Sequence, residues 1–336
     1  MIDFRSDTVT KPTNAMKEAM MHASVGDDVY EDDLTIKHLE QAAADKLGKE
    51  AALFVPSGTM GNQIAIMTHT NRGDEIIIGA HSHIKNYEVG AAAVLAGVSY
   101  HLVNETKGMM DINAIKEGIR GEDIHFPKTS LICMENAHGS GVVGSLEYMK
   151  EVYNLATKNG IYVHLDGARI FNAATHLNVD VKLMAQYADS IMFCLSKGLA
   201  SPIGSILVGT KAFILKARKY RKMLGGGMRQ VGVLGAPGLI ALNEMTKRLK
   251  TDHDHALYLA DELEKIEGFK VNKEALDINM VFVKSTYDLK VLSEKMRKHD
   301  VLLGGYKGEY MRLVCHNDIT KPMIDTFIQL LNKLIK

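Results

Sequence analysis

Short apolar segments alternate with stretches of helical periodicity along the chain from residue 51 onward. This alternation is typical of α/β folds, in which a helix connects one strand to the next. Because the apolar segments lack polar residues at alternate positions, we expect a mostly parallel sheet that helices cover on both faces. The predicted strands lie at residues 51–55, 75–79, 98–103, 130–134, 161–166, 190–195 and 205–208. Side chains that carry chemistry should gather where these strands end.

The residues before this alternation predict an N-terminal arm. Residues 1–33 are polar and irregular, apart from a predicted helix at residues 14–23 that Thr13 can cap. A long polar segment without periodicity is either disordered or held against something else, such as a partner subunit. Residues 34–47 carry apolar side chains at helical spacing, and Gly48 suits the end of that helix.

The residues after the alternation predict a second, smaller domain. A long helical stretch at residues 239–266 is interpreted as a bridge between two domains. Beyond it, predicted strands at residues 269–272, 280–283, 301–303 and 311–315 are interleaved with predicted helices at residues 288–299 and 321–335. This mixture favours a small α+β domain. We therefore divide the chain into an arm at 1–33, a large domain at 34–240 and a small C-terminal domain at 241–336.

Charge and composition narrow the class of protein. Forty basic residues balance forty acidic ones, so the net charge does not indicate binding to nucleic acid or to an anionic membrane. The first residues are charged and polar where a secretory signal needs an apolar core, and no segment approaches membrane-spanning length. We expect a cytosolic protein with a small-molecule partner. Cys133, Cys194 and Cys315 are scattered and lie mostly in apolar segments, which favours core packing over disulfides or a metal cluster.

One lysine stands at the end of a predicted strand. Lys197 follows the apolar residues 191–195 and is flanked by Ser196 and Gly198, which have little bulk. Partial burial of a lysine amine makes its neutral, nucleophilic form accessible. Lys197 is therefore a candidate for a Schiff base with a carbonyl cofactor. The alternative is an ordinary surface lysine in a turn.

Residues 56–62 place small and hydroxyl side chains between a predicted strand and a predicted helix. Free N–H groups and the helix dipole favour an anion at such a helix start. Gly58 and Gly61 permit close approach, and Ser57 and Thr59 add donors. The segment is a candidate phosphate site, although it matches neither the dinucleotide fingerprint nor the P-loop. The alternative is a capped turn.

Asp166 ends the predicted strand at residues 161–166 and is followed by Gly167 and Arg169. A buried carboxylate needs a partner, and Arg169 is near enough in sequence to provide one. The functional alternative is that Asp166 faces a pyridinium nitrogen and keeps it protonated, which makes the cofactor ring an electron sink. A helical pattern separates Asp166 from Lys197, so both can lie at neighbouring strand ends.

Histidines supply further candidates. His81 and His83 follow the predicted strand at residues 75–79, and an imidazole there can lie on a cofactor ring while it reaches a substrate hydroxyl. The same pair resembles metal ligands, but no convincing third ligand lies nearby in sequence, so we rank zinc below ring stacking. A plain surface histidine is a further alternative. His125 and His138 are additional candidates.

Arg312 lies inside the predicted strand at residues 311–315 of the small domain. An arginine within a strand needs an anion, and its guanidinium group suits a substrate carboxylate. The alternative is a salt bridge to a nearby acidic side chain.

Taken together, these motifs resemble the low-specificity L-threonine aldolases, which are enzymes of the aspartate-aminotransferase fold type (fold type I) that depend on pyridoxal 5'-phosphate (PLP). The resemblance spans essentially the full chain. The motifs are Asp-Phe-Arg-Ser-Asp-Thr-Val-Thr (3–10), Val-Gly-Asp-Asp-Val-Tyr (25–30), Phe-Val-Pro-Ser-Gly-Thr-Met-Gly-Asn (54–62), His-Leu-Asp-Gly-Ala-Arg-Ile-Phe-Asn (164–172), Cys-Leu-Ser-Lys-Gly (194–198) and Met-Leu-Gly-Gly-Gly-Met-Arg-Gln (223–230).

The resemblance implies a role for each candidate. Lys197 would form the Schiff base with PLP, and Asp166 would pair with the pyridine nitrogen. The cofactor-binding residues would be Ser57, Gly58, Thr59, His83, Asp166, Arg169, Ser196, Lys197 and, from a neighbouring subunit, Arg229. The substrate-binding residues would be Ser6, Tyr30, Arg169 and Arg312. For the base we expect His83, acting directly or through a water, with His125 as the second candidate. The implied assembly is a homotetramer built as a dimer of dimers. No metal ion is expected in the site.

The implied reaction is reversible cleavage of L-threonine or L-allo-threonine to glycine and acetaldehyde. The alternatives are another PLP reaction on amino acids, such as β-elimination or racemisation, and a catalytically silent PLP-binding protein. The sequence departs from the usual family pattern at four positions that bear on substrate preference, namely Glu31, Leu34, Gly139 and Gly144.

Overall fold

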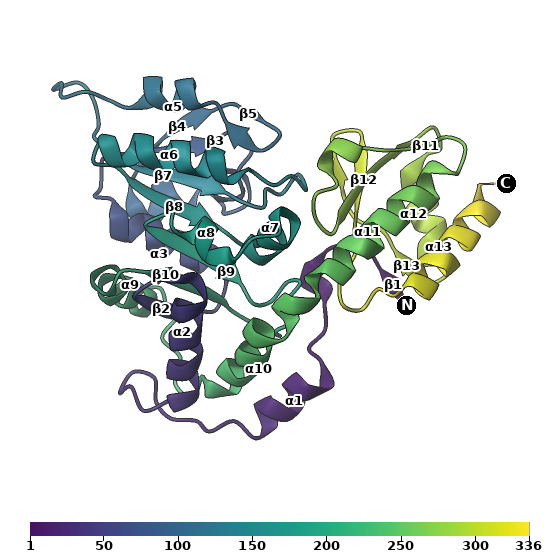
Figure 1. The fold of residues 1–336 in the computed structure, drawn as a ribbon, viewed down its shortest axis with the longest axis horizontal. Helices are drawn as coiled ribbons and strands as arrows, with labels where there is room; N and C mark the ends of the chain where they lie inside the picture. Colours follow the sequence, from purple (N-terminus) through teal and green to yellow (C-terminus); the bar gives the residue numbers. More distant parts are fainter. Residues whose placement is uncertain (336) are drawn as a thin grey trace.

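A computed structural model describes residues 1–335, apart from the side chain of Lys307. A large layered domain lies beside a smaller C-terminal domain, and α11 (Leu249–Glu264) runs between them (Figure 1). No helix among the described residues is long and apolar enough to cross a membrane. The cytosolic location and the residue limits of the domains stay predictions.

The large domain is built on a seven-stranded sheet with the order β2-β10-β9-β8-β7-β3-β4. Its strands are β2 (Ala51–Val55), β3 (Glu75–Gly79), β4 (Ser99–Val103), β7 (Thr129–Glu135), β8 (Tyr162–Asp166), β9 (Ser190–Cys194) and β10 (Ser205–Gly209). Only β10 runs antiparallel to its two neighbours, β2 and β9. The prediction of a mostly parallel α/β sheet is therefore confirmed.

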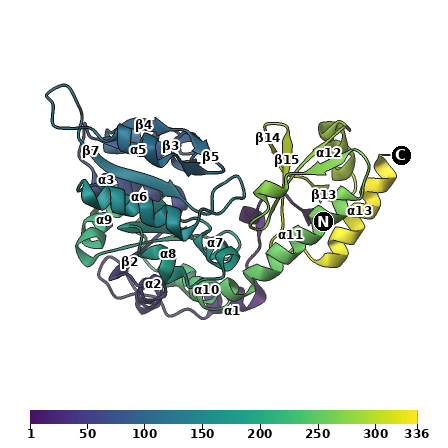
Figure 2. The same ribbon diagram turned by 45° about the horizontal axis from the view of Figure 1, so that its top comes forward.

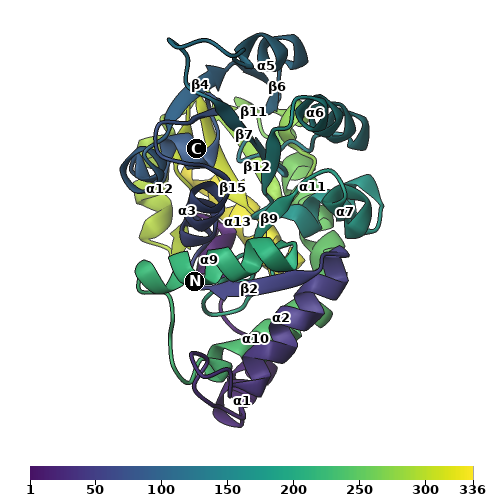
Figure 3. The ribbon, with the colours of Figure 1, turned by 90° about the vertical axis from the view of Figure 1, so that its left-hand side faces the viewer.

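Helices cover both faces of this sheet. One face packs against α2 (Leu34–Leu47), α6 (Leu146–Lys158), α7 (Ile170–Leu177) and α8 (Val181–Ala185), and the other against α3 (Gly58–His69) and α9 (Lys211–Met223). In Figure 3, β2 lies between α9 and α2, and both helices contact it. Adjacent strand residues such as Met192 and Phe193 belong to cores on opposite faces. The strands read as continuously apolar because both faces are buried.

Shorter elements complete the large domain and the arm. They are η1 (Asp7–Val9), α1 (Asn14–Met21), α4 (His83–Asn86), η2 (Ala92–Ala96), β5 (Glu105–Thr106), β6 (Met109–Met110), α5 (Ile112–Gly118) and α10 (Gly232–Asn243). Two predicted helix ends are confirmed. Thr13 accepts a hydrogen bond from the backbone of Met16 at the start of α1, and Gly48 ends α2 with a left-handed φ of 65°.

The C-terminal domain has its own sheet of four antiparallel strands, in the order β11-β12-β15-β14. Its elements are β11 (Phe269–Val271), η4 (Lys273–Ala275), β12 (Met280–Ser285), α12 (Leu289–Arg297), β13 (Val301–Leu302), β14 (Tyr306–Lys307), β15 (Tyr310–Val314) and α13 (Lys321–Leu334). The predicted α+β character is confirmed. The continuous helix predicted at residues 239–266 is wrong, because η3 (Met245–Arg248), a 3₁₀ segment, separates α10 from α11.

The arm joins the two domains. Its first strand, β1 (Ile2–Asp3), pairs in parallel with β13, so the predicted strand at residues 301–303 lies outside the small sheet. Phe4 is fully buried in the C-terminal core, with its ring centroid 5.1 Å from that of Phe327. From there the arm passes along the large domain toward α1 (Figures 1 and 2). Residues 6–9 therefore lie between the domains.

Candidate functional site

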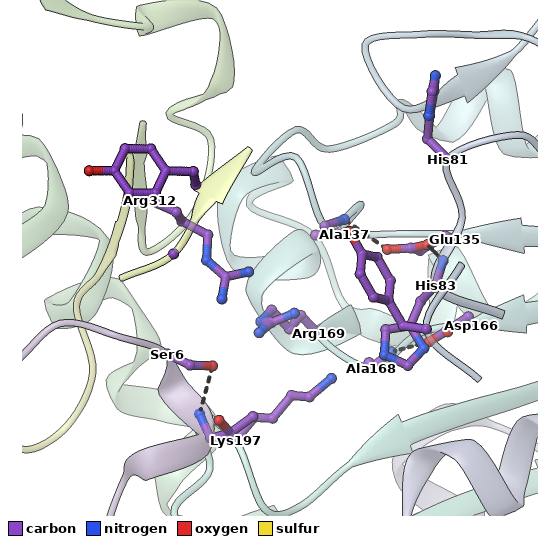
Figure 4. Close-up of a pocket in the computed structure, with 15 residues that line it drawn as sticks. Ser6, His81, His83, Glu135, Ala137, Asp166, Ala168, Arg169, Lys197 and Arg312 are labelled. Atoms are coloured by element: carbon purple, nitrogen blue, oxygen red, sulfur yellow. Dashed lines mark hydrogen bonds between the residues drawn. The ribbon is translucent and has the colours of Figure 1, made fainter. Parts of the chain in front are cut away.

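Two cavities meet at Lys197. One, of about 360 Å³, opens between the arm, the large domain and the C-terminal domain, and its lining includes Ser6, Arg169 and Arg312. The other, of about 280 Å³, lies at the start of α3 and is lined by Ser57, Gly58, Thr59, Ser196 and Gly204, among others. Lys197, His83, Asp166 and Ala168 line both cavities. Figure 4 shows the first cavity.

The parallel strands explain why these side chains meet. His83 follows β3, Asp166 is the last residue of β8, and Lys197 follows β9. The carboxyl ends of these parallel strands face the same edge of the sheet, as the sequence predicted. Lys197 is half-buried and lies in a turn that is closed by hydrogen bonds from the backbone N–H groups of Leu195 and Ser196 to the carbonyl oxygen of Gly204. It is not a surface lysine on a solvated turn.

Asp166 is buried and does not pair with Arg169. Its Oδ2 accepts a hydrogen bond from Asn62 Nδ2 at 2.9 Å, and its Oδ1 accepts one from the backbone of Ala168 at 3.1 Å. No arginine or lysine within the described residues forms an ion pair with it. The interpretation of Asp166 and Arg169 as a structural pair is therefore wrong, and the carboxylate of Asp166 faces the two cavities.

Arg169 pairs instead with Asp7 of the arm. Arg169 Nε and Nη2 donate to the two carboxylate oxygens of Asp7 at 2.7 and 2.6 Å. Burial on its own would raise the pKa of Asp7, but the charge and hydrogen bonds of Arg169 outweigh it and lower that pKa to about 2. The pair anchors the arm across the domain boundary and leaves the other N–H groups of Arg169 for the cavity. Sequence reasoning gave Asp7 no role.

We expect Asp7→Asn to lower the free energy of unfolding by about 3–5 kcal/mol at pH 7, because it leaves the guanidinium of Arg169 buried without a counter-ion. The folded-state pKa of Asp7, about 2, lies below its ordinary value of 3.8. The wild-type protein therefore keeps this stabilisation above about pH 4 and loses much of it as the pH falls through 2, so the difference between the two proteins should narrow in that window. Urea unfolding at several pH values measures the difference. The control is Asp3→Asn, which removes the outer pair with Arg5 and should cost less than about 1 kcal/mol. An Asp7→Asn protein as stable as this control would contradict the assignment.

His83 is held from two sides. Its backbone N–H donates to Glu135 Oε2 at 2.7 Å, and its Nδ1 lies 3.0 Å from Oε1 of the buried Glu88. The hydrogen bond to Glu88 is the main cause of a raised pKa for His83, although burial opposes it. A carboxylate at Nδ1 fixes the proton there, so Nε2 of the neutral ring is the acceptor.

Glu135 is a site residue that sequence reasoning left without a role. It ends β7 beside Asp166 in the sheet register, and its oxygens accept from the backbones of His83 and Gly139 at 2.7 Å. Burial and the nearby charge of Asp166 raise the pKa of Glu135 to about 7. The position of Glu135 at the end of a strand was the one feature of the sequence that could have indicated this role.

Arg312 extends from β15 of the C-terminal domain into the first cavity (Figure 4). Its one recorded hydrogen bond is a long one, 3.4 Å from Nη2 to the carbonyl oxygen of Arg5. Among the described residues, no carboxylate forms an ion pair with it, so the salt-bridge alternative is wrong. Burial lowers the pKa of Arg312, and the charge of Arg169 acts in the same direction. The cavity therefore holds two adjacent guanidinium groups, of which only Arg169 has a counter-ion.

The second cavity is shaped to receive an anion. Ser57 caps α3 by accepting a hydrogen bond from the backbone of Met60 at 3.2 Å. A Cβ at Gly58 would lie 3.1 Å from Cys194 Sγ, and a Cβ at Gly61 would lie 2.7 Å from Met192 Cγ. The glycines thus let the start of α3 pack directly on β9. The free N–H groups of that helix end face a cavity that Lys197 also lines.

Four of the predicted residues, His125, Arg229, Tyr30 and His138, lie outside both cavities. His125 is exposed in the loop before β7, at the opposite end of that strand from Glu135, and its Nδ1 lies 2.7 Å from Asp123 Oδ1. Arg229 pairs with Asp27 at 3.0 Å, and Tyr30 is 76% exposed. Within this chain, His125, Arg229 and Tyr30 do not line either cavity beside Lys197. His81 lines the first cavity, whereas His138 is buried and its Nδ1 lies 2.7 Å from Ser140 Oγ.

Comparison with known proteins gives one consistent result. Residues 3–286 match the family described as beta-eliminating lyases. The chain is 46% identical to low-specificity L-threonine aldolase 1 of Arabidopsis thaliana, over 95% of this chain and 92% of the relative. It is 42% identical to low specificity L-threonine aldolase of Escherichia coli K12, over 96% of each. The solved structure of Leishmania major threonine aldolase is 18% identical and superposes over 100% of both chains with a TM-score of 0.85, which is a likeness of fold.

Proposed function

Because this chain belongs to the beta-eliminating lyase family, we propose that it is a PLP-dependent lyase that cleaves L-threonine and L-allo-threonine to glycine and acetaldehyde. Relatives 46% and 42% identical over nearly the whole chain are named for low-specificity L-threonine aldolase activity. The observation that carries the proposal is the position of Lys197, which lies where an anion-binding cavity meets a cavity lined by two arginines.

The residues around Lys197 fit PLP. The start of α3, with Ser57, Gly58 and Thr59, suits the phosphate, and Ser196 lines the same cavity. Asp166 would face the pyridine nitrogen, His83 would lie against the ring, and Lys197 would bind the aldehyde carbon. When bound, PLP supplies an electron sink for the electron pair that remains on Cα as the Cα–Cβ bond breaks.

The arginines would orient the substrate. A carboxylate placed between Arg312 and the free N–H groups of Arg169 makes charge-assisted hydrogen bonds to both, and Ser6 lines the same cavity. This fixes one end of the amino acid while Lys197 lies at the other side, so that the Cα–Cβ bond can be held in the reactive orientation. Arg169 is a positioned clamp because Asp7 holds its other edge.

His83 would accept the proton of the β-hydroxyl at Nε2. Glu88 keeps the Nδ1 proton in place and stabilises the positive charge that the ring acquires. Removal of that proton lets the Cβ–O bond become the carbonyl of acetaldehyde while the Cα–Cβ bond breaks. His125 would need to come from another subunit to share this role, because it lies far from the cavities in its own chain.

A pH profile tests the pairing of His83 and Glu88. The base must be neutral, and its pKa is raised, so kcat/KM should fall as the pH drops through that raised value. In Glu88→Gln the charge is gone, so the acidic limb should move to lower pH by about one unit. Measurement of kcat/KM for L-threonine between pH 5 and pH 9 gives the result, and Glu122→Gln, in an exposed loop, is the control. An acidic limb that stays in place would exclude His83 as the titrating base.

The assembly belongs to the same proposal. Arg229 and Tyr30 lie outside the cavities of their own chain, and the arm carries much polar surface. We propose a homotetramer built of dimers, in which Arg229 reaches the phosphate cavity of a neighbour. Light scattering should give about four times the chain mass of 37.0 kDa. A monomer with full activity would refute the assembly.

Product analysis tests the reaction. Incubation of the holoenzyme with each of the four threonine stereoisomers should release equal amounts of glycine and acetaldehyde from L-threonine, L-allo-threonine or both. Release of 2-oxobutanoate and ammonia would instead identify β-elimination, and conversion to D-threonine or D-allo-threonine would identify racemisation. Either of these products without glycine would overturn the proposal.

A further inference from the structure

A line of buried hydrogen bonds runs behind the proposed cofactor site, from His83 to the far end of α3. It passes through Glu88, Asn62, His164 and Ser190 to His69, with Asp166 attached at Asn62. Glu88, Asn62, Asp166, His164 and Ser190 are each at most 2% exposed. Polar groups so deeply buried are costly unless every one finds a partner, so the direction of each bond can be worked out.

Asn62 stands between two carboxylates. Its Nδ2 lies 2.9 Å from Glu88 Oε1 and 2.9 Å from Asp166 Oδ2, so both of its hydrogens are donated. Its Oδ1 must then accept, and His164 Nε2 lies 3.0 Å away. A flipped amide would turn its oxygen toward both carboxylates, which would leave three acceptors in contact without a proton. The N–H of His164 thus holds the amide in the one orientation that satisfies Glu88 and Asp166.

The remaining contacts fix the tautomer of His164. Because Nε2 carries the proton, Nδ1 accepts from Ser190 Oγ at 2.9 Å, and Ser190 Oγ in turn accepts from His69 Nε2 at 2.8 Å. Burial lowers the pKa of His164 to about 4 and that of His69 to about 3, so both rings are neutral. The orientation of Asn62 therefore does not change across the neutral pH range.

The two carboxylates depend on Asn62 to different degrees. Glu88 also accepts from Gln63 Nε2 at 2.6 Å and contacts His83 Nδ1. Within the described residues, the carboxylate of Asp166 has only one further hydrogen bond, from the backbone of Ala168. Two like charges in a buried site repel each other, and the amide of Asn62 offsets that repulsion because it donates to both carboxylates. Asp166 has fewer other donors, so it depends more strongly on Asn62.

We propose that Asn62, locked by His164, is a positioning residue that keeps Asp166 ionised and directed at the cofactor's ring nitrogen. This inference rests on the proposed function, because it assumes that PLP occupies the site. An ionised Asp166 keeps the ring nitrogen protonated, which the electron sink requires. The same amide connects Asp166 to Glu88 and thereby to His83, so one side chain supports both the ring nitrogen and the base.

The test is the ¹⁵N NMR signal of PLP labelled at its ring nitrogen and bound to the protein. In the wild-type protein the signal should be that of a protonated pyridine, and in Asn62→Ala it should move toward the unprotonated position, with kcat about 10–100-fold lower. Gln63→Ala is the matched control, since it is a neighbour on α3 that donates to Glu88 and not to Asp166. Its ¹⁵N signal should stay at the wild-type position.

A second pair of variants keeps the test decisive if Asn62→Ala does not fold. In the His164→Gln variant, the glutamine amide can place an N–H near the position that Nε2 of His164 occupies. In the His164→Asn variant, the asparagine side chain is too short to do so. We expect the first to keep the wild-type ¹⁵N signal and the second to lose it. Identical signals in wild type and Asn62→Ala, or in the two His164 variants, would overturn the inference. Failure of the wild-type protein to bind PLP would instead overturn the proposed function.

Discussion

Lys197→Ala is expected to abolish acetaldehyde release, with kcat at least about 10⁴-fold below the wild-type value, the scale of losing a nucleophile on which the reaction depends. The same variant should lose the visible absorbance of covalently held cofactor. The physical reason is that Lys197 is the one lysine that lines either cavity among the described residues, so no other amine can replace it. Absorbance spectra and an acetaldehyde assay of the purified variant measure both effects.

The matched control is Lys49→Met. Lys49 is also half-buried, and burial lowers its pKa, but its amine donates to the carbonyl oxygen of Ala188 at 2.6 Å and lies outside the cavities. Its removal should leave the visible absorbance and the acetaldehyde rate close to wild type. A yellow, active Lys197→Ala protein would show that the covalent amine lies elsewhere.

Arg312→Leu is expected to lower kcat/KM for L-threonine by about 10²–10⁴-fold, because it removes two charge-assisted hydrogen bonds to the substrate carboxylate of about 1.5–3 kcal/mol each. The loss should fall mainly on KM, while the affinity for PLP stays within about threefold of wild type. Arg312 makes no ion pair in the described structure, so its replacement breaks no internal salt bridge. Steady-state kinetics and titration of the apoenzyme with PLP separate the two effects.

Two further variants sharpen that experiment. Arg312→Lys keeps the charge but loses the planar pair of donors, so it should recover only part of kcat/KM. Arg297→Leu, at the end of α12 and outside the cavities, should behave as wild type. An unchanged KM in Arg312→Leu would place the substrate carboxylate elsewhere.

The fold was largely predictable because the strands of the large sheet are buried on both faces and therefore read as uninterrupted apolar segments. Where local pattern was weak, prediction failed. The pairing of Ile2 and Asp3 with β13 involves two residues without periodicity. The break at Met245–Arg248 is a 3₁₀ segment between two helices, and its side-chain pattern differs little from that of a continuing helix.

Much of the site could also be predicted, because its residues lie at the ends of these recognisable strands. Asp166 and Lys197 could be placed at one sheet edge from the order of strands alone. The partners of these residues could not. Asp7, Asn62 and Glu88 take their roles from tertiary contacts, and nothing local distinguishes them from ordinary polar residues. His125 and Arg229 show the reverse case, since motif resemblance named them and a single chain leaves them outside the cavities.

Whether Lys197 carries the cofactor is tested most directly by reducing the wild-type holoenzyme with borohydride and mapping the labelled peptide by mass spectrometry. Reduction makes the bond between lysine and PLP permanent. We expect the pyridoxyl label on the peptide that contains Lys197, in a yield of about one label per chain, and none when the cofactor has first been removed as its oxime by an excess of hydroxylamine. A label on another lysine, or no label on a protein that cleaves threonine, would contradict the assignment.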